Sequence, residues 1–139
     1  MNDNNIRTEI KKHEGYSATV YVDSVGVPTV GYGHALLQGS KIPHMVAELL
    51  FDQDFDIAVK DYEILTLRWS INLDPVRRGV LVNMLFNMGM SRVSKFQKML
   101  TVLQAGDYDK AADEMLDSRW ATQVGKRADE LAKIMRNGG

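Results

Sequence analysis

The chain has 139 residues, of which 45% are hydrophobic and 25% charged, as is typical of one globular domain with its own hydrophobic core. It contains no cysteine, which excludes a disulfide framework, a thiol nucleophile and a cysteine-based zinc site. The net charge is only −1, far from the basic density of a nucleic-acid-binding protein.

Residues 1–12 lack the apolar core of a signal peptide. No apolar run in the chain approaches the roughly 20 residues of a membrane span. We therefore expect a cytoplasmic protein, as synthesised, without stable membrane insertion. Action on a substrate outside the cytoplasm would require a separate release route.

The first element is predicted to be a helix that Asn4 or Asn5 caps and that Gly15 ends. Glu14 then lies at the C-terminal end of this helix. There the helix dipole favours the protonated carboxyl, which is the form in which a general acid acts.

A hairpin is predicted next, with strands at 18–22 and 29–33 and a turn at 23–28 that contains Asp, Gly and Pro. Gly31 and Gly33 weaken the returning strand. Glycines in a strand usually mark the close approach of another group to the backbone. Here that group could be the first helix or a substrate.

The rest of the chain is predicted to be helical, with residues 64–73 ambiguous between a helix and an irregular link. The helix after Asp74-Pro75 is apolar on almost all sides up to Gly89, so it is predicted to be the central buried helix. Four other helices are expected: one at about 44–63, one that follows a turn at 91–94 and runs through residue 103, one at 107–116 and one at 126–135. A junction is expected at 118–120. The predicted class is α+β, with a small hairpin lobe and a larger helical lobe.

Two carboxylates and a hydroxyl stand out as candidate chemistry, namely Glu14, Asp23 and Thr29. Glycosidic cleavage commonly uses such a pair, one carboxyl protonating the leaving oxygen and the other activating water. Spacing alone is weak evidence, because charged groups near a hairpin are usually solvated surface residues. His34 is better explained as a structural histidine than as a metal ligand, and no metal site is predicted.

Five blocks carry a resemblance to a known family: E-G-Y-x-x-x-x-Y-x-D (14–23), T-V-G-Y-G-H (29–34), L-F-D-Q-D-F-D-I-A-V (50–59), L-D-P-V-R-R-G-V-L-V-N-M-L-F-N-M-G (73–89) and S-R-W-A-T-Q-V-G-K-R-A (118–128). With these blocks in this order, the chain resembles the phage T4-type lysozymes, the muramidases of glycoside hydrolase family 24. Many phage endolysins belong to that family.

The resemblance implies a lysozyme-like fold of one domain, with an active-site cleft between a hairpin lobe at about 14–42 and a helical lobe of 43–139 together with 1–13. It implies Glu14 as the catalytic acid, with Asp23 and Thr29 as the other catalytic residues.

Five further residues match the supporting or substrate-binding positions of the family. His34 corresponds to the histidine that supports Asp23, and Ala35 follows it. Arg127 corresponds to the arginine that pairs with the acid. The cleft positions on the central helix are Phe86 and Asn87.

The family cleaves the β-1,4 bond between N-acetylmuramic acid and N-acetylglucosamine in peptidoglycan without a cofactor, and its T4 member inverts the anomeric centre. By this resemblance we expect a monomeric phage or prophage endolysin. Its partner would be the glycan strand, reached through a holin or another route.

The chain departs from the family in a shorter segment between His34 and Leu50 and in Met99 and Glu114, which stand at sugar-contact positions. It also lacks a strongly basic charge. These departures leave open a binding or scaffolding domain on the same fold, with little or no activity. A lytic transglycosylase needs only the single acid, and the retained Asp23 and Thr29 argue against it.

Overall fold

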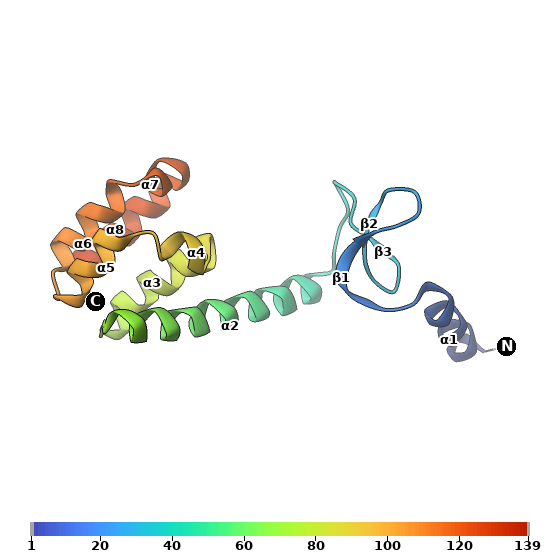
Figure 1. Cartoon of the computed structure of the whole chain (residues 1–139). Coiled ribbons are helices and arrows are strands. Elements are labelled where there is room, and N and C mark those ends of the chain that lie inside the picture. The colour runs from blue at the N-terminus through green and yellow to red at the C-terminus, as the bar shows by residue number, and fades with distance from the viewer. Residues whose placement is uncertain (1, 139) are drawn as a thin grey trace. The chain divides into compact units, whose positions relative to one another are not determined.

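The computed structural model describes residues 2–138, which form helices and one small antiparallel sheet (Figure 1). The elements in chain order are α1 (Asp3–Glu14), β1 (Ser17–Val22), β2 (Pro28–Gly31), β3 (His34–Ala35), α2 (His44–Trp69), α3 (Pro75–Met88), α4 (Met90–Val93), α5 (Gln97–Gln104), α6 (Tyr108–Leu116), α7 (Arg119–Val124) and α8 (Lys126–Asn137). This architecture confirms the predicted α+β class.

The chain divides into two compact units, Met1–His44 and Met45–Gly139. The first contains α1 and the sheet, and the second contains the other helices except for the first residue of α2. The predicted lobe boundaries, with residues 1–13 assigned to the helical lobe, stay a prediction. No helix among residues 2–138 is both long and apolar enough to cross a membrane.

Helix α1 begins two or three residues earlier than the sequence suggested. Its N-cap is Asn2, whose side chain accepts a hydrogen bond from the Asn5 N–H at 2.9 Å. The prediction of Asn4 or Asn5 as the cap was therefore wrong, because both residues lie inside the first turn. The C-terminal end is as predicted: Gly15 adopts a φ of 73° and Glu14 is the last helical residue.

The predicted hairpin is confirmed as the antiparallel pair β1–β2, and a third strand that was not predicted follows it. Strand β3 has two residues, too few for a period-2 pattern. Thr29 lies opposite Tyr21 on one side and Ala35 on the other, so it occupies the middle strand. Its side chain is the buried one among described residues 2–44.

Helix α2 continues to Trp69, beyond the predicted end at about residue 63. Its buried residues, Ala58, Tyr62 and Leu65, follow one another at helical spacing. The apolar stripe therefore crosses the ambiguous segment 64–73 and keeps most of it helical.

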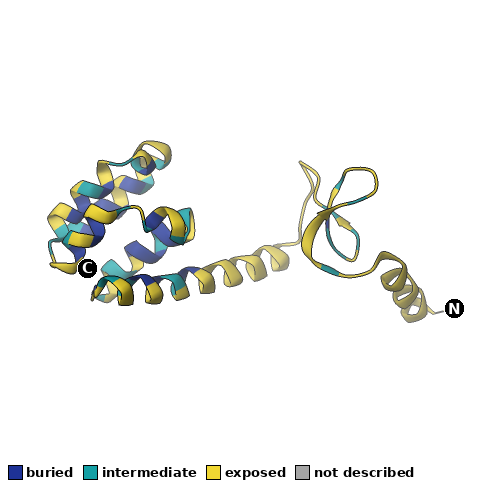
Figure 2. Ribbon diagram, viewed as in Figure 1, coloured by how far each residue is buried: buried dark blue, intermediate teal, exposed yellow. Residues whose placement is uncertain are grey.

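Helix α3 is the buried helix that the sequence predicted. Asp74 caps it by accepting from the backbone N–H groups of Val76 and Arg77, Pro75 is its first residue, and Gly89 ends it. Its fully or nearly fully buried residues are Val80, Leu81, Val82, Met84 and Leu85. They form the centre of a core to which α2, α5, α6 and α8 contribute (Figure 2).

Two short helices were missed where the sequence suggested only a turn or a junction. Helix α4 occupies most of the predicted turn at 91–94 and buries Val93. Helix α7 begins at the predicted junction, where Ser118 accepts a hydrogen bond from the Ala121 N–H, and it buries Trp120. Helices of four and six residues are too short for a clear 3.6-residue pattern.

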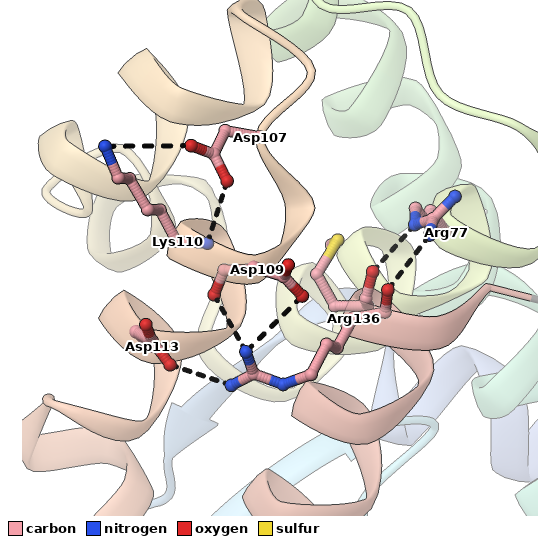
Figure 3. A network of polar contacts seen from close by, with 7 residues as sticks. Arg77, Asp107, Asp109, Lys110, Asp113 and Arg136 are labelled. Atoms are coloured by element: carbon pink, nitrogen blue, oxygen red, sulfur yellow. Dashed lines mark hydrogen bonds and ion pairs between the residues drawn. The ribbon is translucent and has the colours of Figure 1, made fainter.

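The C-terminal end of α8 is held by two arginines (Figure 3). Arg77 donates from Nε to the Met135 carbonyl at 2.7 Å and from Nη2 to the Arg136 carbonyl at 3.2 Å. Arg136 donates from Nη2 to Asp113 at 2.7 Å, and this hydrogen bond is the main cause of its raised pKa. These contacts link α3, α6 and α8 at one end of the second unit.

Candidate functional site

Glu14, the predicted acid, packs against the backbone of the hairpin. Its side chain lies beside Gly33 in the turn between β2 and β3, so close that a Cβ at residue 33 would stand 2.9 Å from Cδ of Glu14. The glycines of this strand were expected to mark the approach of either the first helix or a substrate. The last residue of α1 makes that approach at Gly33, within the first unit.

Asp23 shapes the turn between β1 and β2. Its Oδ1 accepts from the backbone N–H groups of Val25 and Val27 at 2.9 and 2.8 Å, as an aspartate does in an Asx-type turn. Both bonds end on the same carboxylate oxygen. Among the described residues 2–138, the turn N–H groups that bind Asp23 both use Oδ1, so Oδ2 takes no part in these two bonds.

Thr29 is tied to the same turn. Its hydroxyl donates to the Val27 carbonyl at 2.8 Å, and that carbonyl also accepts the Asp23 backbone N–H at 2.9 Å. Val27 therefore connects two of the three predicted catalytic residues. Because the hydroxyl proton is used inside the hairpin, Thr29 is set to accept a hydrogen bond rather than donate one.

His34 and Ala35 form β3, with Val30 opposite His34 and Thr29 opposite Ala35. The structure thus places Ala35 beside the middle of the sheet and His34 one residue beyond Gly33. The support of Asp23 by His34 and the substrate contacts of Ala35 stay predictions.

Phe86 and Asn87 lie on the last turns of α3, in the second unit. The Phe86 ring contacts Phe51 of α2, with centroids 5.4 Å apart, and is 39% exposed. Asn87 accepts a hydrogen bond from Nε1 of Trp120 at 2.7 Å through its Oδ1. This bond orients the amide so that its NH₂ group, which has two donors, points away from the indole.

Arg127 is held by a residue that the sequence analysis missed. Its Nε and Nη2 donate to Oδ1 of Asn83 at 3.0 and 2.7 Å. Asn83 precedes Asn87 by one helical turn on α3, and a polar residue in so apolar a helix was the available signal. The pairing of Arg127 with Glu14 stays a prediction.

A hollow of about 650 Å³ opens beside Trp120 between α4, α5, α6 and α7. Its apolar lining includes Met88, Phe96 and Trp120, whose ring meets Phe96 edge to face at 6.4 Å. Charged side chains of both signs surround it, namely Arg92, Lys95, Lys98, Glu114, Asp117 and Arg119. Such a mixture suits a ligand that has both polar and apolar groups.

Met99 and Glu114, which the sequence analysis expects at sugar-contact positions, both line this hollow. Their side chains differ in how far they are exposed there. Met99 is 1% exposed, so its side chain belongs mainly to the core. Glu114 is half-buried and brings a carboxylate to the wall.

Residues 11–136 match the phage lysozyme family model. A probable T4-type lysozyme 2 from Dictyostelium discoideum is 29% identical, over 96% of this chain and 94% of its own length. A second lysozyme of that organism, probable T4-type lysozyme 1, is 28% identical over the same shares.

A third relative is much longer than this chain. The pre-baseplate central spike protein of Enterobacteria phage T4 is 30% identical over 93% of this chain, which corresponds to 27% of the spike protein. The family match covers both units, including all eight predicted site residues. The helical architecture with its small antiparallel sheet is the lysozyme-like α+β fold, and the chain belongs to the phage lysozyme family.

Proposed function

We propose that the protein is a muramidase that hydrolyses the β-1,4 bond between N-acetylmuramic acid and N-acetylglucosamine in peptidoglycan. Family membership supports a muramidase-like glycoside hydrolase. The assignment of the reaction and its residues is supported by the arrangement of side chains within the first unit. This unit holds Glu14 against the β2–β3 turn and ties Asp23 and Thr29 to the backbone of one residue, Val27.

In the proposed reaction, Glu14 is the general acid. Its carboxyl proton passes to the glycosidic oxygen while the bond from that oxygen to the anomeric carbon breaks. Glu14 becomes a carboxylate, and the released sugar leaves with a neutral hydroxyl. The reaction needs no cofactor, because side chains supply and accept every proton.

Asp23 and Thr29 act on the attacking water. The backbone N–H groups of Val25 and Val27 fix one oxygen of Asp23, so the other can accept a proton from the water. Thr29 accepts a hydrogen bond from the same water, since its own proton is engaged with Val27. The water oxygen then bonds to the anomeric carbon on the face opposite the departing group, which inverts the configuration.

The second unit would bind the polymer. Phe86 offers an exposed aromatic ring, and Asn87 offers amide donors that Trp120 holds in place. We further propose the role of a phage or prophage endolysin, a monomer made in the host cytoplasm and released through a holin or another route. Its partner is the peptidoglycan glycan strand.

The first test is the loss of turbidity of chloroform-treated Gram-negative cells. Wild-type protein is expected to clear the suspension, and Glu14→Gln is not. The matched control is Glu9→Gln, which alters another glutamate of α1 whose carboxylate pairs with His13 at the surface. It is expected to clear cells at the wild-type rate.

Analysis of the released fragments identifies the reaction. N-acetylmuramic acid with a free reducing end is expected from hydrolysis, whereas 1,6-anhydro ends would replace the proposal with a lytic transglycosylase. If the wild type clears no cells and releases no fragments, the scaffolding alternative takes its place. Binding of a host protein that Glu14→Gln leaves unchanged would then be the supporting result.

A further inference from the structure

We infer that Gly33 is a positioning residue for Glu14, one that keeps the acid in place by having no side chain. This inference rests on the proposed role of Glu14 as the catalytic acid. Gly33 lies between β2 and β3, 19 positions after Glu14 in the sequence, and belongs to the same compact unit.

A side chain at position 33 would collide with the Glu14 carboxyl in its present position. A Cβ there would lie 2.9 Å from Cδ of Glu14 and 3.4 Å from Cγ, and it would be nearest to Oε2. Non-bonded carbon atoms prefer separations of about 3.5–4.0 Å. A methyl group at residue 33 and the carboxyl of Glu14 therefore exclude each other from the positions seen here.

The carboxyl would yield, because it is the free end of a flexible side chain and the turn is backbone. The carboxyl of Glu14 would then leave the position that it occupies beside the turn. Catalysis is sensitive to such shifts, since a misplacement of about 1 Å lowers rates by about a hundredfold. The glycine thus acts on the reaction through Glu14 and does not itself need to touch the substrate.

Backbone conformation is a second reason for glycine at this position. Its effect has to be distinguished experimentally from the steric contact with Glu14. Gly33 has a φ of 76°, a region that residues with a Cβ rarely adopt. Gly31, the last residue of β2, has a φ of 69°, but a Cβ at residue 31 would meet nothing within 4 Å. The two glycines share the backbone requirement, and only Gly33 carries the contact with Glu14.

This pair defines the experiment. Gly33→Ala and Gly31→Ala are compared with the wild type for turnover of purified peptidoglycan. We expect Gly33→Ala to lower kcat about a hundredfold with little change in KM. We expect Gly31→Ala to retain kcat within a few-fold of the wild type. Equal losses in the two variants would overturn the inference.

A second measurement does not depend on activity. In protein labelled with ¹³C at glutamate carboxyl groups, the Glu14 resonance is identified by its absence from Glu14→Gln. We expect that resonance to move in Gly33→Ala and to stay in place in Gly31→Ala. An unmoved resonance in Gly33→Ala would contradict the inference. If the wild type shows no turnover, the proposed function fails and this measurement still decides whether Gly33 positions Glu14.

Stability provides the test if Gly33→Ala folds poorly. The same substitution is made in a Glu14→Ala background, where there is no carboxyl to displace. We expect Gly33→Ala to lower the midpoint of thermal unfolding less in that background, by about as much as Gly31→Ala does in the wild type. An equal or larger decrease in the Glu14→Ala background would show that backbone strain alone requires the glycine, and the inference would be wrong.

Discussion

The guanidinium of Arg127 rests on a single oxygen of Asn83, which accepts hydrogen bonds from Nε at 3.0 Å and Nη2 at 2.7 Å. The two donors fix the plane of the guanidinium as well as its position. Five N–H groups are present in an arginine side chain, so others remain for a carboxylate. Asn83 therefore orients Arg127, which the sequence analysis predicts to support the site.

Substitution of Asn83 tests this relationship. In Asn83→Ala the guanidinium loses its anchor, so we expect turnover of peptidoglycan to fall by about tenfold to a hundredfold. The midpoint of thermal unfolding should change by only a few degrees, because the side chain is half-buried at the edge of the core. Activity that survives in Asn83→Ala but not in Arg127→Ala would show that the anchor is dispensable.

The adjacent residues Arg77 and Arg78 are predicted to differ sharply in their effect on stability. Arg77 is 15% exposed and donates to the carbonyls of Met135 and Arg136 (Figure 3). Its guanidinium carbon also lies 3.7 Å from the centroid of the Tyr108 ring. Arg77→Met leaves those carbonyls unpaired, so we expect it to lower the free energy of unfolding by about 3 kcal/mol.

Arg78→Met is the matched control for that substitution. Arg78 interacts with the Tyr62 ring at the longer distance of 5.4 Å, and we expect its loss to lower the free energy of unfolding by less than about 1 kcal/mol. Urea denaturation of the three proteins measures both values. Similar losses in the two variants would mean that the carbonyl contacts of Arg77 add little.

Gly79 offers a stabilising substitution. It lies inside α3, has a helical backbone, and would bring a Cβ near no other atom within 4 Å. Because glycine weakens a helix relative to alanine, Gly79→Ala should raise the free energy of unfolding by about 0.5–1 kcal/mol.

Gly106→Ala provides the opposite case, since Gly106 has a φ of 74° and no steric neighbour within 4 Å. It is expected to lower the free energy of unfolding by about 1–2 kcal/mol, the strain of a left-handed alanine. Thermal or urea unfolding measures both variants. Destabilisation by Gly79→Ala would show that residue 79 needs glycine for a reason outside its helix.

Asp74 makes stability depend on pH in the acid range. The backbone N–H of Arg77, followed by the Arg77 side chain, holds the pKa of Asp74 below its ordinary value of 3.8. Because the pKa of this carboxyl is lower in the folded state, the unfolded chain takes up the proton at a higher pH than the folded protein does. Its contribution to stability is therefore complete above about pH 5 and disappears as the pH falls through the lower, folded pKa.

Asp74→Asn tests this dependence. Asparagine still caps α3 but neither titrates nor attracts Arg77 by charge, so the variant should unfold at a lower temperature at pH 6. Between pH 5 and pH 2.5 the unfolding temperature of the wild type should decrease more than that of the variant. Calorimetric scans across that range measure the difference, and parallel curves for the two proteins would exclude the effect.

Local sequence patterns predicted the elements whose signals lie within a few residues. Asp74 followed by Pro75 marked the start of α3, and Gly15 and Gly89 marked the ends of α1 and α3. Caps and turns depend on hydrogen bonds that span two to four residues, so their signals lie close together in the sequence, although the N-cap of α1 was placed two or three residues too late. The two-residue strand β3 and the short helices α4 and α7 were missed, since elements of two to six residues have no clear period.

The sequence by itself determined the α+β class, the position of Glu14 at the end of a helix, and the turn that carries Asp23. Only the tertiary structure decided which distant residues hold the site side chains. Gly33 leaves room for Glu14, Asn83 anchors Arg127 from 44 positions away, and Trp120 orients Asn87 from 33 positions away. Such contacts arise from the packing of whole elements, and no periodicity within a short window of sequence records which elements will meet.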